Sequence, residues 1–203
     1  MCFTGPAAVG EATQDRDVPL LSKEEEKTLL RLARHTLKVH LATGCAPVDL
    51  SDFKITPALK KEMGAFVTLK INGRLRGCIG YLQGIKPLFK AIIDNTISAA
   101  SKDPRFPPVE PAEEPEIDME ISVLSPVVIV KNLDEIVVGR DGLIISQGYH
   151  RGTLLPQVPE EYGWNRVEFL EQTCRKAGLS REAYKDSNTK IEKYSAQVFS
   201  EKP

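Results

Sequence analysis

The residues best suited to chemistry lie in one short motif, LRGCIG at positions 75–80, which ends a predicted strand. A thiol becomes a good nucleophile or ligand when a nearby positive charge lowers its pKa, and Arg76 stands two residues before Cys78. Gly77 and Gly80 remove side-chain bulk, so that a ligand or another backbone can approach closely. The motif therefore predicts a thiol site with Arg76, Gly77 and Gly80 as ligand contacts. The alternative is that Cys78 packs in a sheet as a small apolar residue.

A nucleophilic thiol needs a base, and His150 is the one histidine outside the first predicted helix. If the two halves of the chain pack together, His150 and Arg151 would face Cys78. The alternative is that His150 is an ordinary loop residue. Arg76 and Arg151 could instead bind an anion through bidentate hydrogen bonds, with a surface role in solubility as the alternative.

No metal site is predicted. Cys78, His150 and Cys174 have no local spacing typical of metal ligands, and Cys174 falls on the apolar stripe of a predicted helix, which favours core packing. Glycine-rich patterns of the G-x-G-x-x-G or P-loop type are absent, so the sequence gives no support for a nucleotide cofactor. The cofactor, if there is one, stays undetermined.

The bulk composition is that of one soluble globular domain. The chain has 203 residues, of which 41% are hydrophobic and 27% charged, and its formal net charge of −1 shows no excess that would favour nucleic acid or an anionic membrane. The four cysteines have no CxxC spacing, which fits reduced thiols, with two long-range disulfides as the alternative. No apolar run is long enough to span a bilayer. We therefore expect a cytoplasmic protein that does not bind membrane, and nucleic-acid binding is disfavoured.

The chain divides into a flexible lead-in at 1–21 and a single domain at 22–200. Ser22 followed by Glu25 has the form of a capping box, so a helix is expected to begin there and to end at Gly44.

A hairpin is predicted next, because Asn72-Gly73 is a strong turn signal between two strand-like segments at 65–71 and 74–79. Simple alternation along the second strand places three side chains on one face: Arg74, Arg76 and Cys78. Pro87 then suits the first turn of a helix that runs to about Ser101.

The second half repeats this pattern. A proline-rich loop at 103–116, whose first four residues could dock onto the body, leads to an alternating strand at 117–123. A second hairpin is expected around Asp141-Gly142, with strands at 135–140 and 143–146. A helix at 165–177 and a closing strand at 194–198 follow. We predict an α+β fold with a mainly antiparallel sheet and two related hairpin-plus-helix halves.

Four segments together resemble the AMMECR family, also called system protein A of the AmmeMemoRadiSam set: LRGCIG at 75–80, DPRF at 103–106, ISVLSP at 121–126 and LLPQV at 154–158. The resemblance implies an α+β fold with one larger and one smaller lobe, and a cleft between them beside the motif. It also implies an intracellular protein associated with a Memo-like protein and a radical SAM enzyme. It implies no particular reaction.

Our leading interpretation is a binding or accessory protein whose cleft holds a small molecule or a partner's peptide. The residues expected to line the cleft are Arg76, Gly77, Cys78, Arg151 and Gln157. One alternative is a thiol-dependent enzyme with Cys78 as nucleophile and His150 as base. A second alternative, a nucleic-acid-binding regulator, is disfavoured by the near-zero net charge.

Overall fold

A computed structural model describes residues 20–44 and 48–202, so most of the predicted lead-in lies outside the described residues. In chain order the helices and strands are α1 (Lys23–Thr43), β1 (Ala65–Ile71), β2 (Arg74–Tyr81), α2 (Leu88–Ser101), β3 (Ile117–Leu124), β4 (Val128–Ile129), β5 (Asp141–Gln147), β6 (His150–Leu154), α3 (Gln157–Glu161), α4 (Arg166–Lys176) and β7 (Lys190–Ser200). Short 3-10 helices lie at Pro111–Glu116 (η1), Leu133–Glu135 (η2) and Ala183–Lys185 (η3). Within the described ranges we find no helix with the length and apolar character needed to cross a bilayer.

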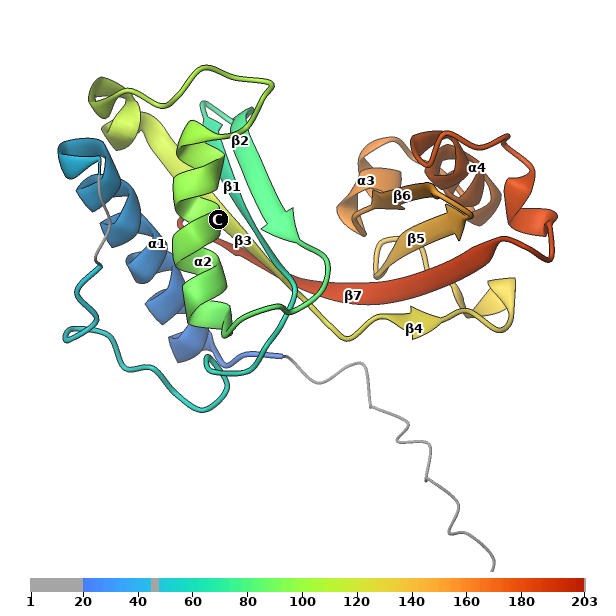
Figure 1. Ribbon diagram of the computed structural model, residues 1–203, viewed down its shortest axis with the longest axis horizontal. Helices are drawn as coiled ribbons and strands as arrows, with labels where there is room; N and C mark the ends of the chain where they lie inside the picture. The colour runs from blue at the N-terminus through green and yellow to red at the C-terminus, as the bar shows by residue number, and fades with distance from the viewer. Residues whose placement is uncertain (1–19, 45–47, 203) are drawn as a thin grey trace, which may run out of the picture.

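One antiparallel sheet connects two lobes. Its strand order is β2-β1-β3-β7-β5-β6, and β4 pairs with β7 beside this path. The long strand β7 pairs with β5 along its first half and with β3 along its second half. Figure 1 shows β7 extending from the smaller lobe, which holds α3 and α4, into the larger lobe, which holds α1 and α2. The predicted α+β fold is confirmed, and the predicted closing strand is longer than expected because it serves both lobes.

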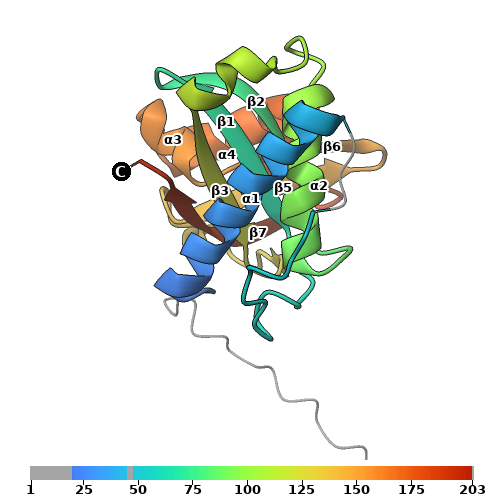
Figure 2. The same cartoon turned by 90° about the vertical axis from the view of Figure 1, so that its left-hand side faces the viewer.

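In the larger lobe, α1 and α2 cover one face of the strands β1, β2 and β3 (Figures 1 and 2). Alternate side chains such as Val67 of β1 and Ile121 of β3 are fully buried on that face. The first helix begins at the predicted capping box and ends at Gly44, whose φ of 67° is left-handed. Leu21 is buried, and its backbone exchanges two hydrogen bonds with the Gln197 side chain. The end of the predicted lead-in is therefore part of the packed body.

The smaller lobe has its own core between α4 and the strands β5 and β6. Phe169, Leu170 and Cys174 of α4 are buried against Leu143 and Ile145 of β5. The predicted core role of Cys174 is confirmed by its complete burial.

The second hairpin is not where Asp141-Gly142 predicted it. The turn falls at Gly148 and Tyr149, between β5 and β6, and the segment predicted as a strand at 135–140 consists of the last residue of η2 and an irregular stretch after it. Asp141 is buried and accepts a hydrogen bond from the backbone of Val137. A Cβ at Gly142 would lie 2.5 Å from the Tyr194 ring. This Asp-Gly pair therefore starts a core strand: the Asp141 side chain is buried, and the buried Tyr194 ring occupies the space beside Gly142.

Candidate functional site

The motif lies in β2, which is an edge strand of the sheet. Leu69 of β1 pairs with Gly77 whereas the next residue, Lys70, pairs with Leu75, so Arg76 is the extra residue of a β-bulge. The predicted common face of Arg74, Arg76 and Cys78 is therefore wrong. The bulge shifts the alternation, so that Leu75 and Cys78 share a face, and it turns Arg76 out of the regular pairing.

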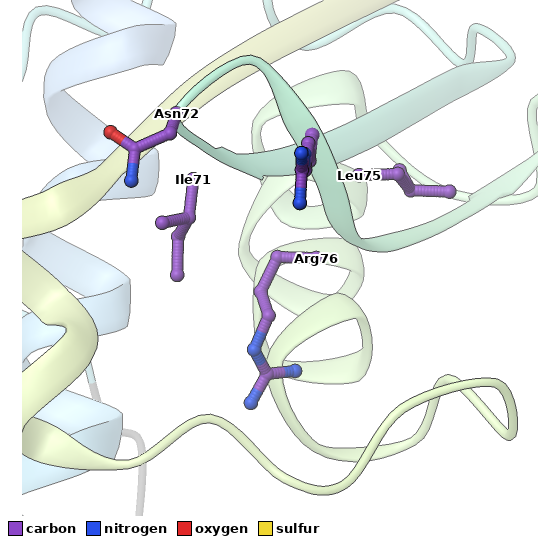
Figure 3. Close-up of a pocket in the computed structure, with 5 residues that line it drawn as sticks. Ile71, Asn72, Leu75 and Arg76 are labelled. Atoms are coloured by element: carbon purple, nitrogen blue, oxygen red, sulfur yellow. The ribbon is translucent and has the colours of Figure 1, made fainter.

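The Arg76 guanidinium binds the proline-rich loop that follows α2. Its Nε and Nη2 donate to the two carboxylate oxygens of Glu113 at 2.7 and 2.9 Å. Its Nη1 and Nη2 donate to the backbone carbonyls of Pro107 and Pro108 at 2.9 and 3.2 Å. Figure 3 shows the Arg76 side chain extending from the strand toward this loop. The bidentate pair holds the pKa of Glu113 below its usual value.

The backbone of Cys78 binds the same loop. Its N–H donates to Asp103 Oδ2 at 2.8 Å, and its carbonyl accepts from Arg105 Nη2 at 3.3 Å. Asp103 and Arg105 form a bidentate ion pair, with Nε to Oδ1 at 2.9 Å and Nη2 to Oδ2 at 2.6 Å. The hydrogen bonds from Arg105 and Cys78 hold the pKa of buried Asp103 far below its usual value. The predicted docking of segment 103–106 is confirmed, and the loop covers an edge whose N–H and C=O groups would otherwise be unpaired.

The Cys78 thiol is half-buried, and Thr68 Oγ1 lies 3.3 Å from its sulfur. Burial raises the pKa of the thiol, and this effect outweighs the lowering by the Thr68 hydrogen bond and by the Arg105 charge. The shift is opposite to the one that the neighbouring Arg76 led us to expect. Arg105, and not Arg76, is the cation that lowers the pKa of the thiol, and the Arg76 guanidinium is instead directed to Glu113 of the loop.

The two glycines of the motif allow close packing. A Cβ at Gly77 would lie 2.2 Å from the backbone oxygen of Ala99, so β2 and α2 can approach only because Gly77 has no side chain. A Cβ at Gly80 would lie 2.4 Å from the Phe66 ring. These contacts explain both glycines by the approach of other protein groups, and a ligand contact at either stays a prediction.

The predicted residues of the second half lie in the smaller lobe. His150 and Arg151 are exposed on β6, opposite Gln147 and Ser146 of β5. The His150 Nδ1 lies 3.3 Å from where a Cβ at Gly178 would stand, next to the end of α4.

Gln157 is the first residue of α3, and its Oε1 is buried without a hydrogen-bond partner among the described residues. No hydrogen bond or ion pair within the described part of the chain joins Cys78 to His150, Arg151 or Gln157. The pairing of Cys78 with His150 stays a prediction.

The described residues contain no group of three or more His, Cys, Asp and Glu side chains that could hold a metal ion.

A cavity of about 540 Å³ opens at the start of the motif (Figure 3). Its lining residues are Ile71, Asn72, Arg74, Leu75 and Arg76. Sequence reasoning did not select Arg74 as a ligand contact. The available signal was its place directly after the Asn72-Gly73 turn, where the side chain stands at the exposed end of the hairpin.

The fold and this edge-strand motif define a two-lobed α+β protein, and comparison with known proteins gives its family. The AMMECR1 family pattern matches residues 30–199, so the chain belongs to that family.

Its relatives cover nearly the whole fold. A protein of Methanothermobacter thermautotrophicus is 45% identical over 187 residues, which cover 89% of this chain and 96% of that protein. Protein PF1979 of Pyrococcus furiosus is 45% identical over 183 residues, which cover 85% of this chain and 86% of that protein. The crystal structure of the uncharacterized protein PH0010 from Pyrococcus horikoshii matches with a TM-score of 0.84 and 41% identity, over 90% of this chain and 94% of that one.

Proposed function

We propose that this AMMECR1-family chain is a binding or accessory protein whose recognition surface is the end of the β1–β2 hairpin, beside the LRGCIG motif. One observation carries the proposal: the 540 Å³ cavity at the motif is lined by Arg74, whose guanidinium has no hydrogen bond or ion pair among the described residues. The neighbouring motif groups are engaged in holding the proline-rich loop. The motif thus supplies a rigid support, and Arg74 supplies a charge available to a partner or ligand.

The chemistry at the motif favours binding over thiol catalysis. A nucleophilic thiol is activated by a base or by an unpaired cation. At Cys78 the pKa is raised by burial, and the cations on either side, Arg76 and Arg105, are each paired with a carboxylate. The thiol-dependent alternative therefore has no specific observation in its favour. The net charge of −1 likewise gives no support to nucleic-acid binding.

The partners we propose are a Memo-like protein and a radical SAM enzyme, the classes that the family resemblance implies. Family membership supports this choice, and the exposed hairpin supplies the surface. The end of the β1–β2 hairpin presents an exposed apolar residue, Leu75, beside the Arg74 guanidinium. A surface that combines apolar and charged groups is expected of an interface that forms and dissociates.

The test is binding of the purified chain to the purified Memo-like and radical SAM proteins of the same organism, measured by biolayer interferometry. The variant Leu75→Asp changes an exposed side chain at the proposed surface, and Val167→Asp changes a similarly exposed residue on α4 as a matched control. We expect Leu75→Asp to weaken binding about tenfold or more, and Val167→Asp to leave it unchanged. Binding that survives Leu75→Asp at full strength, or no binding to either protein, would contradict the proposal.

A further inference from the structure

The Arg74 guanidinium at the end of the first hairpin differs from the neighbouring guanidinium groups in having no carboxylate partner among the described residues. The other guanidinium groups close to the motif are neutralised: Arg76 by Glu113, Arg105 by Asp103, and Arg34 by Glu114 and Glu201. Arg74, which is exposed, has no such partner within the described ranges. The cavity that it lines therefore carries one positive charge that the protein itself does not compensate.

The rest of the lining is mainly apolar. Ile71 and Leu75 extend on opposite sides of the hairpin end (Figure 3), and Leu75 is 41% exposed. Arg76 borders the cavity, but four hydrogen bonds to Glu113, Pro107 and Pro108 already occupy its guanidinium. An incoming anion would have to displace Glu113 to use it. The volume of about 540 Å³ lies within the usual range for small-ligand sites.

These features select a ligand with one negative charge next to an apolar group. A guanidinium binds a carboxylate through two parallel hydrogen bonds, and the flanking aliphatic side chains gain from covering an apolar neighbour of that carboxylate. A doubly charged phosphate would be less well matched, since the lining offers one unpaired cation and apolar surface in place of a second charge.

We propose that this cavity binds a carboxylate borne on an apolar group, with Arg74 as the bidentate donor and Ile71 or Leu75 as the apolar contact. The inference rests on the proposed function and deepens it, because it names the chemistry that the hairpin end recognises. The carboxylate could belong to a small organic acid or to an acidic segment of a partner protein, and the experiment separates these two sources.

The probe is N-acetyl-leucine, with N-acetyl-leucinamide as its uncharged counterpart of the same shape. Each is titrated into the uniformly ¹⁵N-labelled full chain while the backbone amide resonances are followed by NMR. We expect the acid to shift the resonances of residues 71–76 with saturation at a Kd of about millimolar, the range typical of so small a ligand. The amide should shift them at least tenfold less at the same concentration. Arg74→Gln should abolish the response, whereas Arg175→Gln, which removes an exposed arginine from α4, should retain it.

Three results would overturn the inference. These are no saturable shift at residues 71–76 up to about 20 mM acid, equal shifts from acid and amide, or an equal response to inorganic phosphate, which has no apolar group. A blocked peptide with one glutamate between two leucines, compared with its glutamine counterpart, identifies the source. Binding of the glutamate peptide assigns the cavity to a partner segment, and binding of N-acetyl-leucine alone assigns it to a small acid. If the carboxylate probes fail while Leu75→Asp still weakens partner binding, this inference fails and the proposed function stands.

Discussion

The two hairpins of this protein have similar architecture, but their edge strands differ in the contacts that neighbouring side chains make with the backbone. In each, the returning strand carries a glycine that closely approaches the backbone of a covering helix or its C-cap: Gly77 approaches Ala99 of α2, and Gly152 approaches Ala177, the C-cap of α4. Each returning strand is also an edge of the sheet. The difference is that side chains of the proline-rich loop bind the backbone of β2 at Cys78, whereas no such side-chain bond to the β6 backbone at His150 or Arg151 is found among the described residues.

The comparison separates what the shared hairpin-plus-helix unit needs from what the LRGCIG motif adds. The glycine is common to both halves, so it belongs to the packing of strand on helix. Arg76 and the Cys78 backbone bind the loop in the first half only, while Arg151, an arginine on the equivalent strand, is exposed without a partner in the described part of the chain. Much of the motif is thus explained by the attachment of one loop to one edge, whereas the Arg74 guanidinium beside it has no hydrogen bond or ion pair among the described residues.

Replacing the shared glycines should break both halves to a similar degree. Gly77→Ala and Gly152→Ala would each place a Cβ within about 2.3 Å of helix backbone atoms, and we expect each to lower the free energy of unfolding by about 3 kcal/mol. Urea unfolding followed by circular dichroism measures this. Gly148→Ala, where a Cβ meets no atom within 4 Å but φ is 58°, should cost about 1 kcal/mol. If Gly152→Ala costs no more than Gly148→Ala, the two halves are not equivalent.

Asp103→Asn should sharpen the difference between the halves, because it removes the carboxylate that binds both Arg105 and the Cys78 N–H. We expect a loss of about 2 kcal/mol at pH 7. Since the pKa of Asp103 is lowered on folding, its contribution is complete above the unfolded pKa of about 4 and declines as the pH falls toward the folded value.

Unfolding in urea from pH 7 to pH 3 should therefore show the wild type and Asp103→Asn converging in stability as the pH falls. Asp134→Asn is the control in the smaller lobe, where Asp134 is exposed and pairs with Arg166. That variant should lie within about 0.5 kcal/mol of wild type at pH 7. A constant gap between wild type and Asp103→Asn at all pH values would refute the proposed role of the carboxylate charge.

Arg76→Gln and Arg151→Gln test the motif most directly, since they change arginines on equivalent strands. Arg76→Gln should cost about 1 kcal/mol, because its ion pair with Glu113 is partly exposed. It should also speed amide hydrogen exchange in the loop at 104–116, which loses four hydrogen bonds. Arg151→Gln should change neither stability nor exchange measurably. Equal effects of the two variants would remove the distinction between the edges.

The smallest effect concerns the Cys78 thiol. Because burial raises its pKa, iodoacetamide should modify it in the native protein more slowly than it modifies free cysteine at pH 8. Cys174, which is completely buried and whose pKa is also raised, should react only after unfolding. Mass spectrometry of tryptic peptides gives both rates. A native Cys78 rate above that of free cysteine would revive the thiol-dependent alternative.

Prediction from the sequence succeeded where neighbours in the chain decide the structure. The capping box of α1, the Asn72-Gly73 turn with positive φ at both residues, and the helix predicted at 165–177, observed as α4, all follow from interactions within a few residues. The α+β class followed from repeating these local patterns. The Asp141-Gly142 turn was predicted on the same local grounds and was wrong, because Tyr194, distant in sequence, packs over Gly142.

For the candidate site, the sequence by itself determined that a thiol, an arginine and two glycines stand together on one strand near a hairpin turn. The tertiary structure decided what each of them meets: Arg76 the carboxylate of Glu113, the Cys78 backbone Asp103, and Gly77 the helix α2. It also left Arg74 without a partner among the described residues. The physical reason is that ion pairing, burial and close backbone approach depend on groups tens of residues away in the chain. The spacing of residues within the motif cannot predict these contacts.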